Sequence, residues 1–557
     1  IDNIPVTRSG KVDRRALPII REGSSKRYVA ACSEEEILVC KTMSEILGVD
    51  QIGIYDNFYA LGGDSIKAIR VTSRFRELGF TLSVKNIMQS TSIGELAEML
   101  VAVGDSDFEQ GEVTGYIKDT PIIKVFKKWN FIRPEYFNQA VMLETDASID
   151  QIRNSLDALV RHHDVLRSVY SNQQLRILPY SEGKHYDFAS YDLSDCTDAP
   201  KCAEEICSNI QSRINLENGP LMKVALFQTE NGSQMMVCIH HLVVDNVSWH
   251  ILIDDFNTAI RQQKQGKSIK LPAKTASFID WANALEAYRS SETLLKEKQY
   301  WEKVNAAIDQ NLFRITNEIR GKEYTVRISL DERYTQRLLY EAGNAYNTQP
   351  QDILLAALGR AVEKVSGQKK VSVCLEGHGR EMLTTAIDVD RTVGWFTSIY
   401  PVILESYEAI EDMVINIKEM LRKVPNHGFG YQFITDIAHC TDANIYFNYL
   451  GENNYADSES ELFSVGKCIA DENCLVGDIQ FNGDITNGIL SFDVGCRQGT
   501  CSEEVISTLA ECYKATLCEI IDCCSMQGEK LRTLSDLDDD ELDDDDLDII
   551  SGLLGLE

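Results

Sequence analysis

Two adjacent histidines, His240 and His241, follow an apolar run of strand length at residues 235–239. An imidazole titrates near neutral pH, so a histidine can take up or release a proton under physiological conditions. Neighbouring side chains of a strand point to opposite faces, so only one of the two can face a given cavity. A short loop that carries Asp245 and Ser248 follows. This arrangement predicts a proton-transfer group held where a buried strand gives way to a loop, a usual place for catalytic side chains.

The residues after this loop are spaced as on a helix with one buried face. Apolar side chains recur at the i, i+3, i+4 and i+7 positions, namely Trp249, Leu252, Ile253 and Phe256. The stretch therefore predicts a strand, a loop and a helix, with the histidine pair at the end of the strand.

Glu376 is a second candidate for proton transfer. Apolar and other residues alternate along 371–376, which predicts a strand that ends at this carboxyl group. A carboxyl group can act as a general acid or base when it lies beside the reacting atom. Two alternatives stay open. Glu376 could form an ion pair with Arg380 or Arg391. His378 could serve as the acid or base in its place.

Ser65 is a candidate for covalent modification. It follows the pair Gly62 and Gly63, which permits a tight turn, and it opens a helical pattern at 65–78. A hydroxyl at a helix N-terminus lies where backbone N–H groups favour a phosphate. The plain alternative is a helix N-cap, a common role of serine at this position.

Several strings resemble one known family. HHLVVDNVSW (240–249) resembles the HHxxxDxxSW signature of the epimerization domains of nonribosomal peptide synthetases, which are relatives of condensation domains and of chloramphenicol acetyltransferase. Condensation domains carry HHxxxD too, so other strings must separate the two. EGHGRE (376–381) and FNYLG (447–451) resemble motifs that favour an epimerization domain. TVGWFTSIYPV (392–402) resembles a further motif of that domain and is expected to shape the architecture.

The resemblance implies roles for the candidate residues. His241 resembles the catalytic base, and Glu376 resembles the acid or base that serves the opposite side of the α-carbon. Asn448 and Tyr449 resemble the residues implicated in stabilising the enolate oxygen. Strand alternation places these two side chains on opposite faces unless a bulge intervenes. His240 is expected to be structural.

Three residues after the histidine pair bear on the geometry of the predicted site. Asp245 and Ser248 are expected to support the site. Asp245 could orient the catalytic histidine, but in this superfamily it more often forms a structural ion pair. Asn246 stands where the family usually has glycine, and asparagine tolerates a positive φ better than most residues.

A second histidine pair, His162 and His163, matches the RHHxxLR element of the superfamily and is interpreted as structural. The sequence has no C-x-x-C pair and no Cys/His cluster at zinc spacing, so we predict no metal site.

The N-terminal part resembles two other modules of these synthetases. Residues 1–18 resemble the closing motif of adenylation domains, with Lys11 as its lysine. DNFYALGGDS (56–65) resembles the core of peptidyl carrier domains, in which the serine receives 4′-phosphopantetheine. The resemblance implies this cofactor on Ser65, a phosphopantetheinyl transferase that attaches it, and an upstream adenylation domain as partner.

These patterns predict a multidomain fold, in which a small four-helix carrier domain precedes a large α/β domain of two chloramphenicol-acetyltransferase-like lobes. In the carrier domain Ser33 and Glu36 form a capping-box pattern, and the last helix is expected over 92–103. The predicted boundaries are an adenylation remnant at 1–18, a linker at 19–32, the carrier domain at 33–103, a linker at 104–114, the epimerization domain at 115–527 with lobes at about 115–295 and 296–527, and an acidic tail at 528–557.

Composition narrows the class of protein. The chain has 557 residues, of which 44% are hydrophobic, and 16 are cysteines. No apolar run is long enough to span a bilayer, so we predict a cytoplasmic protein with reduced thiols and no membrane partner. The net charge of −31 argues against a nucleic-acid partner.

The C-terminal segment concentrates acids. Residues 533–557 contain 11 acidic and no basic side chains, with leucines and isoleucines at roughly helical spacing. One interpretation is a solvated acidic tail. We favour a segment that docks onto the condensation domain of a downstream synthetase module.

The predicted reaction is epimerization of an L-aminoacyl or peptidyl thioester carried on Ser65, by removal of the α-proton and its return on the opposite face. The alternatives are condensation-type formation of a peptide bond and an inactive docking scaffold, the latter because of Asn246.

Overall fold

The computed structural model describes residues 28–536, apart from 60, 64, 103–107, 231, 309–322, 382–386, 436–442, 453–461, 474–477, 498–500 and 528–529. The predicted adenylation remnant with Lys11, residues 537–557 of the predicted tail and the side chain of Ser65 lie outside the described part. Among the described helices, none combines the length and the apolarity that crossing a membrane requires.

The N-terminal unit is a helical bundle with a short two-stranded ribbon. Its elements are α1 (Glu34–Leu47), α2 (Ser65–Glu77), β1 (Phe80–Thr81), α3 (Val84–Gln89), α4 (Ile93–Glu98) and β2 (Val101–Ala102). The predicted capping box is present, because Ser33 Oγ accepts the Glu36 N–H at 3.0 Å and the Glu36 carboxylate accepts the Ser33 N–H at 3.0 Å. The helix predicted over 92–103 ends at Glu98, since β2 pairs antiparallel with β1 instead of continuing the helix.

The first lobe of the large domain contains two sheets. Its strands are β3 (Gly115–Ile117), β4 (Asn138–Thr145), β5 (Ser168–Ser171), β6 (Gln174–Ile177), β7 (Asp187–Asp192), β8 (Met222–Thr229) and β9 (Gly232–His240). The main sheet has the order β4-β9-β8-β7, and the smaller sheet has the order β3-β6-β5. Strand β9 is buried on both faces between β4 and β8, as its continuous apolar run predicts.

Helices cover the first lobe and lead to the second. They are α5 (Pro121–Trp129), α6 (Ile149–His162), α7 (Ala199–Gln211), α8 (Asn246–Lys264), α9 (Phe278–Tyr288) and α10 (Glu292–Ala306). Helix α8 carries the predicted apolar face, with Trp249, Leu252, Ile253 and Phe256 all buried.

The second lobe is one six-stranded sheet with the order β10-β15-β14-β13-β11-β12. Its strands are β10 (Glu323–Ser329), β11 (Lys370–Gly377), β12 (Ser398–Glu405), β13 (Ile445–Glu452), β14 (Ile479–Thr486) and β15 (Ile489–Arg497). Its helices are α11 (Glu332–Tyr340), α12 (Pro350–Ser366), α13 (Ile410–Arg422), α14 (Tyr431–Ile434) and α15 (Glu503–Met526).

The six-stranded sheet has two different faces. One set of alternate side chains, such as Leu375 and Phe447, belongs to the core of the second lobe under its helices. The other set, such as Cys374 and Tyr446, belongs to a core shared with the first lobe. This second face is therefore turned toward the junction of the lobes, and its polar residues are available to a site there.

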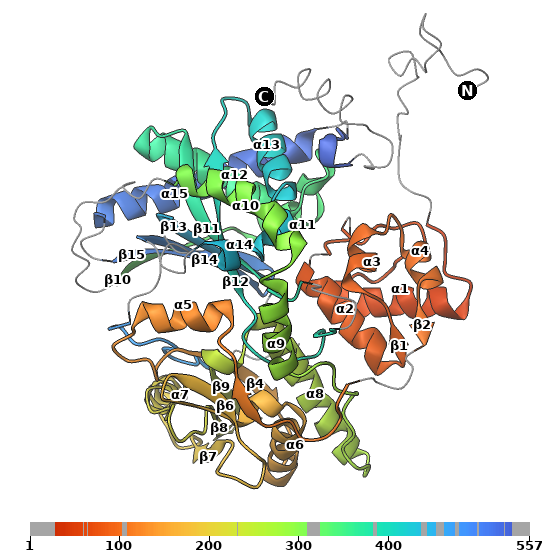
Figure 1. Ribbon diagram of the computed structural model, residues 1–557, viewed down its shortest axis with the longest axis vertical. Helices are drawn as coiled ribbons and strands as arrows, with labels where there is room; N and C mark the ends of the chain where they lie inside the picture. Colours follow the sequence, from red (N-terminus) through yellow and green to blue (C-terminus); the bar gives the residue numbers. More distant parts are fainter. Residues whose placement is uncertain are drawn as a thin grey trace, which may run out of the picture.

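The carrier-like bundle lies beside the same junction, with α2 turned toward the lobes (Figure 1). Ile69 of α2 packs into the core that the first lobe shares with the second. The bundle thus has its own core and a further contact with the large domain.

The last residues that the structure describes are held on the second lobe by a buried lysine. Lys418 Nζ donates to Thr533 Oγ1 at 2.8 Å and forms an ion pair with Asp536 at 2.6 Å. Thr533 also donates to Glu419 at 2.5 Å. Residues 531–536, which belong to the predicted tail, therefore pack on the second lobe. Asp536 there compensates the positive charge of the buried Lys418.

Candidate active site

His241 is the first residue after β9 and opens a 3-10 turn, His241–Val243. Its Nδ1 lies 2.8 Å from the carbonyl oxygen of Val244. A carbonyl only accepts, so Nδ1 carries the hydrogen and Nε2 is bare in the neutral ring. The ring stacks on Phe137 with centroids 5.0 Å apart and lies 4.4 Å from the Trp395 centroid. Burial lowers the pKa of His241, which favours a neutral base at this position.

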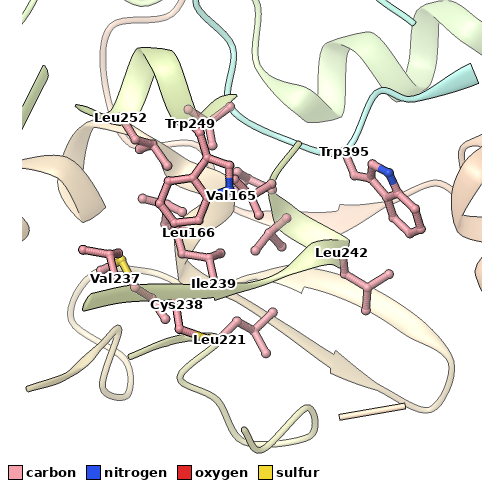
Figure 2. Close-up of a cluster of buried hydrophobic side chains, with 14 of the residues drawn as sticks. Val165, Leu166, Leu221, Val237, Cys238, Ile239, Leu242, Trp249, Leu252 and Trp395 are labelled. Atoms are coloured by element: carbon pink, nitrogen blue, oxygen red, sulfur yellow. The ribbon is translucent and has the colours of Figure 1, made fainter. Parts of the chain in front are cut away.

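Trp395 reaches the histidine from the second lobe. Figure 2 shows it beside Leu242, on a segment separate from α8, which carries Trp249. The Trp395 ring therefore packs against the His241 ring across the junction of the lobes.

His240 is fully buried and points away from this ring. Its Nε2 donates to the carbonyl oxygen of Pro134 at 2.8 Å, and its Nδ1 accepts the Leu242 N–H at 3.2 Å. Burial lowers the pKa of His240 to about 3. Both ring nitrogens are occupied by backbone groups, which fits the structural role expected from the sequence.

Asp245 forms an ion pair with Arg380, whose Nη2 lies 3.0 Å from Oδ1. Asp245 also caps α8 by accepting the Ser248 N–H at 2.8 Å, and it accepts the Phe396 N–H at 3.1 Å. Ser248 Oγ in turn accepts the Gly394 N–H at 3.0 Å. The sequence left open whether Asp245 orients the histidine or forms a structural ion pair. Its described contacts are those of an ion pair and a helix cap.

Asn246 is the first residue of α8 and has no positive φ. The position therefore needs no left-handed backbone, and the replacement of the family's usual glycine leaves the helix start intact.

Glu376 lies near the end of β11 and accepts a hydrogen bond from the hydroxyl of Tyr446 on β13. Burial raises the pKa of Glu376, and the Tyr446 hydrogen bond opposes this increase. The two arginines proposed as its ion-pair partners bind elsewhere, Arg380 to Asp245 and Arg391 to Asp255. That alternative was wrong, because each arginine is held by a carboxylate of the first lobe.

His378 is less suited to proton transfer than Glu376. Its Nδ1 accepts the Arg380 N–H at 3.0 Å and lies 3.5 Å from a Glu381 carboxyl oxygen. Burial lowers the pKa of His378 to about 3 and raises the pKa of Glu381 to about 8. Both groups are therefore neutral near pH 7.

Asn448 and Tyr449 are neighbours on β13, and alternation separates them. Phe447 belongs to the core of the second lobe, and Tyr449 packs against the same core. Tyr446 belongs to the core shared with the first lobe, so Asn448 lies on the face that carries Tyr446 and Glu376. The register shift in β13 comes only after Tyr449. Tyr446 was missed from the sequence, although a period of two from Asn448 points to it.

The second histidine pair belongs to a buried charge network. His163 Nε2 lies 2.8 Å from Asp255 Oδ2, and the other oxygen of Asp255 binds Arg391 at 2.5 Å. His162, His163 and Asp255 could group around a cation. Arg391 already supplies a positive charge to Asp255, which fits the structural role expected for this pair.

The carrier-like bundle contacts the large domain through α2. Lys67 forms an ion pair with Glu452 at the end of β13, at 2.6 Å. Arg76 forms an ion pair with Asp388, and Arg391 donates to Ser73. Ser65 opens the same helix, two residues before Lys67, so the predicted attachment point lies on the helix that contacts the large domain.

Comparison with known proteins agrees with this arrangement. The family described as "Condensation domain" matches residues 125–542, and the "Phosphopantetheine attachment site" family matches residues 38–100. The chain belongs to the nonribosomal peptide synthetases. It contributes a phosphopantetheine-binding carrier domain followed by a domain of the condensation superfamily.

Two synthetases are similar over nearly the whole chain. Surfactin synthase subunit 1 of Bacillus subtilis (strain 168) is 36% identical, over 98% of this chain and 16% of that protein. Gramicidin S synthase 1 of Brevibacillus brevis is 35% identical, over 100% of this chain and 54% of that protein. The chain thus spans between about a sixth and about half of these synthetases.

Solved structures show the same fold. The epimerization domain from the third module of tyrocidine synthetase B has a TM-score of 0.70 and 34% identity, over 76% of this chain and 100% of that domain. The condensation domain of the monacolin K polyketide synthase MokA has a TM-score of 0.59 at 13% identity, over 75% of this chain and 99% of that domain, which shows the fold alone.

The first prediction concerns the Asp245–Arg380 ion pair. Removing one partner of a buried pair leaves the other charge uncompensated, which costs about 3–5 kcal/mol. We expect Arg380→Met to lower the free energy of unfolding of the large domain by that amount, measured by urea unfolding with tryptophan fluorescence. Arg327→Met, which removes a pair with Asp493 that is exposed on both sides, is the control and should cost about 0–1 kcal/mol. Equal effects of the two variants would contradict the assignment.

Proposed function

We propose that the large domain epimerizes the aminoacyl or peptidyl group that the carrier domain presents as a thioester. The supporting observation is that two proton-transfer groups, His241 and Glu376, are placed on different lobes that the Asp245–Arg380 ion pair joins. Each group lies four residues before one member of the pair, so the pair sets one relative to the other.

The proposed reaction needs a base on one side of the α-carbon and an acid on the other. His241 Nε2 removes the α-proton, and the electron pair of the broken bond moves onto the thioester oxygen to give an enolate. Glu376 returns a proton to the opposite face. Burial favours the neutral forms of both groups, which are the forms that this direction requires.

The enolate oxygen needs a hydrogen-bond donor. Asn448 lies on the face of β13 that carries Tyr446, whereas Tyr449 packs against the core of the second lobe. We therefore assign the donor to the Asn448 side-chain amide. Tyr446 assists by stabilising the Glu376 carboxylate through its hydrogen bond.

The carrier domain supplies the substrate through 4′-phosphopantetheine, which we place on Ser65. The position fits the group, because Ser65 is the first residue of α2 and the N–H groups of a helix start favour a phosphate. The cofactor supplies the thioester bond that makes the α-proton acidic. Lys67 holds the helix against Glu452, which keeps the attachment point beside β13.

Three partners follow from this proposal. An upstream adenylation domain activates the amino acid, a phosphopantetheinyl transferase modifies Ser65, and a downstream condensation domain accepts the product. Condensation-type peptide-bond formation is the rival reaction, and an inactive docking scaffold is the rival of another class. The Glu376–Tyr446 contact favours epimerization over both, because it tunes a second proton-transfer group opposite the histidine.

The second prediction tests the two bases. The full chain is loaded on Ser65 with L-aminoacyl groups, and the released amino acid is resolved by chirality. We expect the wild type to give both enantiomers. His241→Ala and Glu376→Gln should load normally and epimerize at least about 10²-fold more slowly. Deuterium uptake from solvent should differ between L and D starting material in each variant. Unchanged L configuration in the wild type would refute the proposed function.

The third prediction concerns Tyr446. Its hydrogen bond lowers the pKa of Glu376, so Tyr446→Phe should raise that pKa further. The limb of the pH–rate profile that reports Glu376 should move to higher pH, because the carboxyl group then stays protonated to higher pH. Tyr513→Phe is the matched control, since it removes a buried hydroxyl in the core of the second lobe for which the described residues supply no hydrogen-bond partner. A profile unchanged in Tyr446→Phe would remove this residue from the proposal.

The fourth prediction separates the docking tail from its anchor. A chain ending at Asp536 keeps the contacts of Lys418, so it should fold and epimerize normally but transfer its product less well to the downstream partner. The loss should be larger at low salt, where charge attraction is less screened. A chain ending at Arg532 lacks Thr533 and Asp536, so it should also lose about 3–5 kcal/mol of stability. Undiminished transfer by the first chain would return the tail to plain acidic surface.

A further inference from the structure

Gln139 on β4 connects the proposed base to a helix of the first lobe. Its Oε1 accepts the indole N–H of Trp249 at 2.9 Å, and its Nε2 lies 3.1 Å from Nε2 of His241. Trp249 is buried in α8 and Gln139 is half-buried. The Gln139 amide therefore bridges the indole N–H of Trp249 and Nε2 of His241.

The direction of both hydrogen bonds follows from the chemistry of the end groups. An indole nitrogen only donates, so the atom of Gln139 that faces Trp249 must be the oxygen and the amide NH2 must face His241. The carbonyl of Val244 fixes the hydrogen of the ring on Nδ1, so His241 Nε2 is an acceptor. The two ends are independent of each other and give the same assignment, in which Gln139 donates to His241.

This donor lies on the lone pair that the proposed reaction uses. The nitrogen has a single lone pair in the plane of the ring, and a proton on it would face the hydrogens of the amide. Turning the amide over would relieve that conflict but would leave the Trp249 N–H opposite another donor. Gln139 thus favours the neutral ring with Nε2 unprotonated.

The other groups around the ring do not supply this function. Phe137 and Trp395 contact its faces. The titratable neighbours that act on His241 are His240, whose own pKa is lowered to about 3, and Asp245, whose charge is paired with Arg380. Among the described residues, Gln139 is the neighbour with a side-chain hydrogen bond to the reacting nitrogen.

We propose that Gln139, oriented by Trp249, is a positioning residue that keeps His241 unprotonated at Nε2 until the substrate displaces the amide. The inference rests on the proposed function of His241. When the thioester enters, the Gln139 N–H moves away from His241 Nε2, and the lone pair of this nitrogen becomes available to the α-proton. The Cα–H bond breaks, the Nε2–H bond forms, and the electron pair moves to the thioester oxygen.

The test replaces the amide by a carboxylate of the same shape. In Gln139→Glu an oxygen faces His241 Nε2 and favours a hydrogen there, so the imidazolium form gains a partner of opposite charge. An opposite charge at this distance shifts a pKa by about 1–3 units. We expect the limb of the pH–rate profile that reports His241 to move up by at least about one unit, with about tenfold lower activity below it and recovery above it.

Two comparisons sharpen the result. Trp249→Phe removes the donor that orients the amide, so the single-turnover rate of epimerization in the loaded chain should fall while loading of Ser65 stays unchanged. Gln228→Glu makes the same substitution at an exposed position of β8 in the same sheet, and it should leave the profile unchanged. A lower rate in Gln139→Glu with an unmoved pH limb would overturn the proposal, because loss of packing alone gives that result.

A readout without turnover separates this inference from the proposed function. The full chain is labelled with 13C at histidine Cε1, the His241 signal is assigned by its loss in His241→Ala, and the signal is titrated by NMR. We expect Gln139→Glu to raise the pKa of His241 by at least about one unit whether or not the wild type epimerizes its substrate. An unshifted titration would refute the role of Gln139 while leaving the proposed function untouched.

Discussion

The ion pair between Asp245 and Arg380 is the contact on which the arrangement of the site depends. Arg380 also donates to the carbonyl oxygens of Val389 and Thr392 at 2.9 and 2.7 Å, and its guanidinium lies 3.8 Å from the Phe396 ring centroid. These contacts fix the guanidinium within the second lobe. A sliding motion of the lobes would therefore separate it from Asp245 and leave a buried charge unpaired. The relative position of the two proposed proton-transfer groups, His241 and Glu376, is thus set by a buried charge pair between Asp245 and Arg380.

The segment 388–396 links this pair to the carrier domain. At its start, Asp388 and Arg391 bind Arg76 and Ser73 of the carrier helix α2. At its end, Trp395 packs on His241, and the Phe396 N–H binds Asp245. The contacts that hold the carrier domain and those that enclose the base therefore belong to one short stretch of chain, and neither set can move far without the other.

Local features of the site could be predicted from the sequence, whereas contacts between distant segments could not. The strand before His241 and the helix after Asp245 follow from apolar spacing within a few residues. By contrast, the Glu376–Tyr446 contact joins positions 70 apart, and Gln139 and His241 are 102 apart. The partner of Arg380, 135 positions away, was left open for the same reason. The packing of Thr533 and Asp536 on the second lobe could not be predicted, because an acidic composition gives no sign of the buried Lys418 that binds Asp536.

The opposite pKa shifts of His241 and Glu376 have one cause, and it gives the site a defined starting state. Burial disfavours charge, so it lowers the pKa of the imidazole and raises that of the carboxyl group. The favoured forms are therefore a neutral imidazole on the proposed base and a neutral carboxyl group on the proposed acid. One turnover would leave an imidazolium and a carboxylate, the costlier pair in a buried site. Tyr446 donates a hydrogen bond to Glu376 and so stabilises the carboxylate form of the proposed acid. Gln139 donates to His241 Nε2 and so destabilises the imidazolium form of the proposed base, which favours its return to the neutral form.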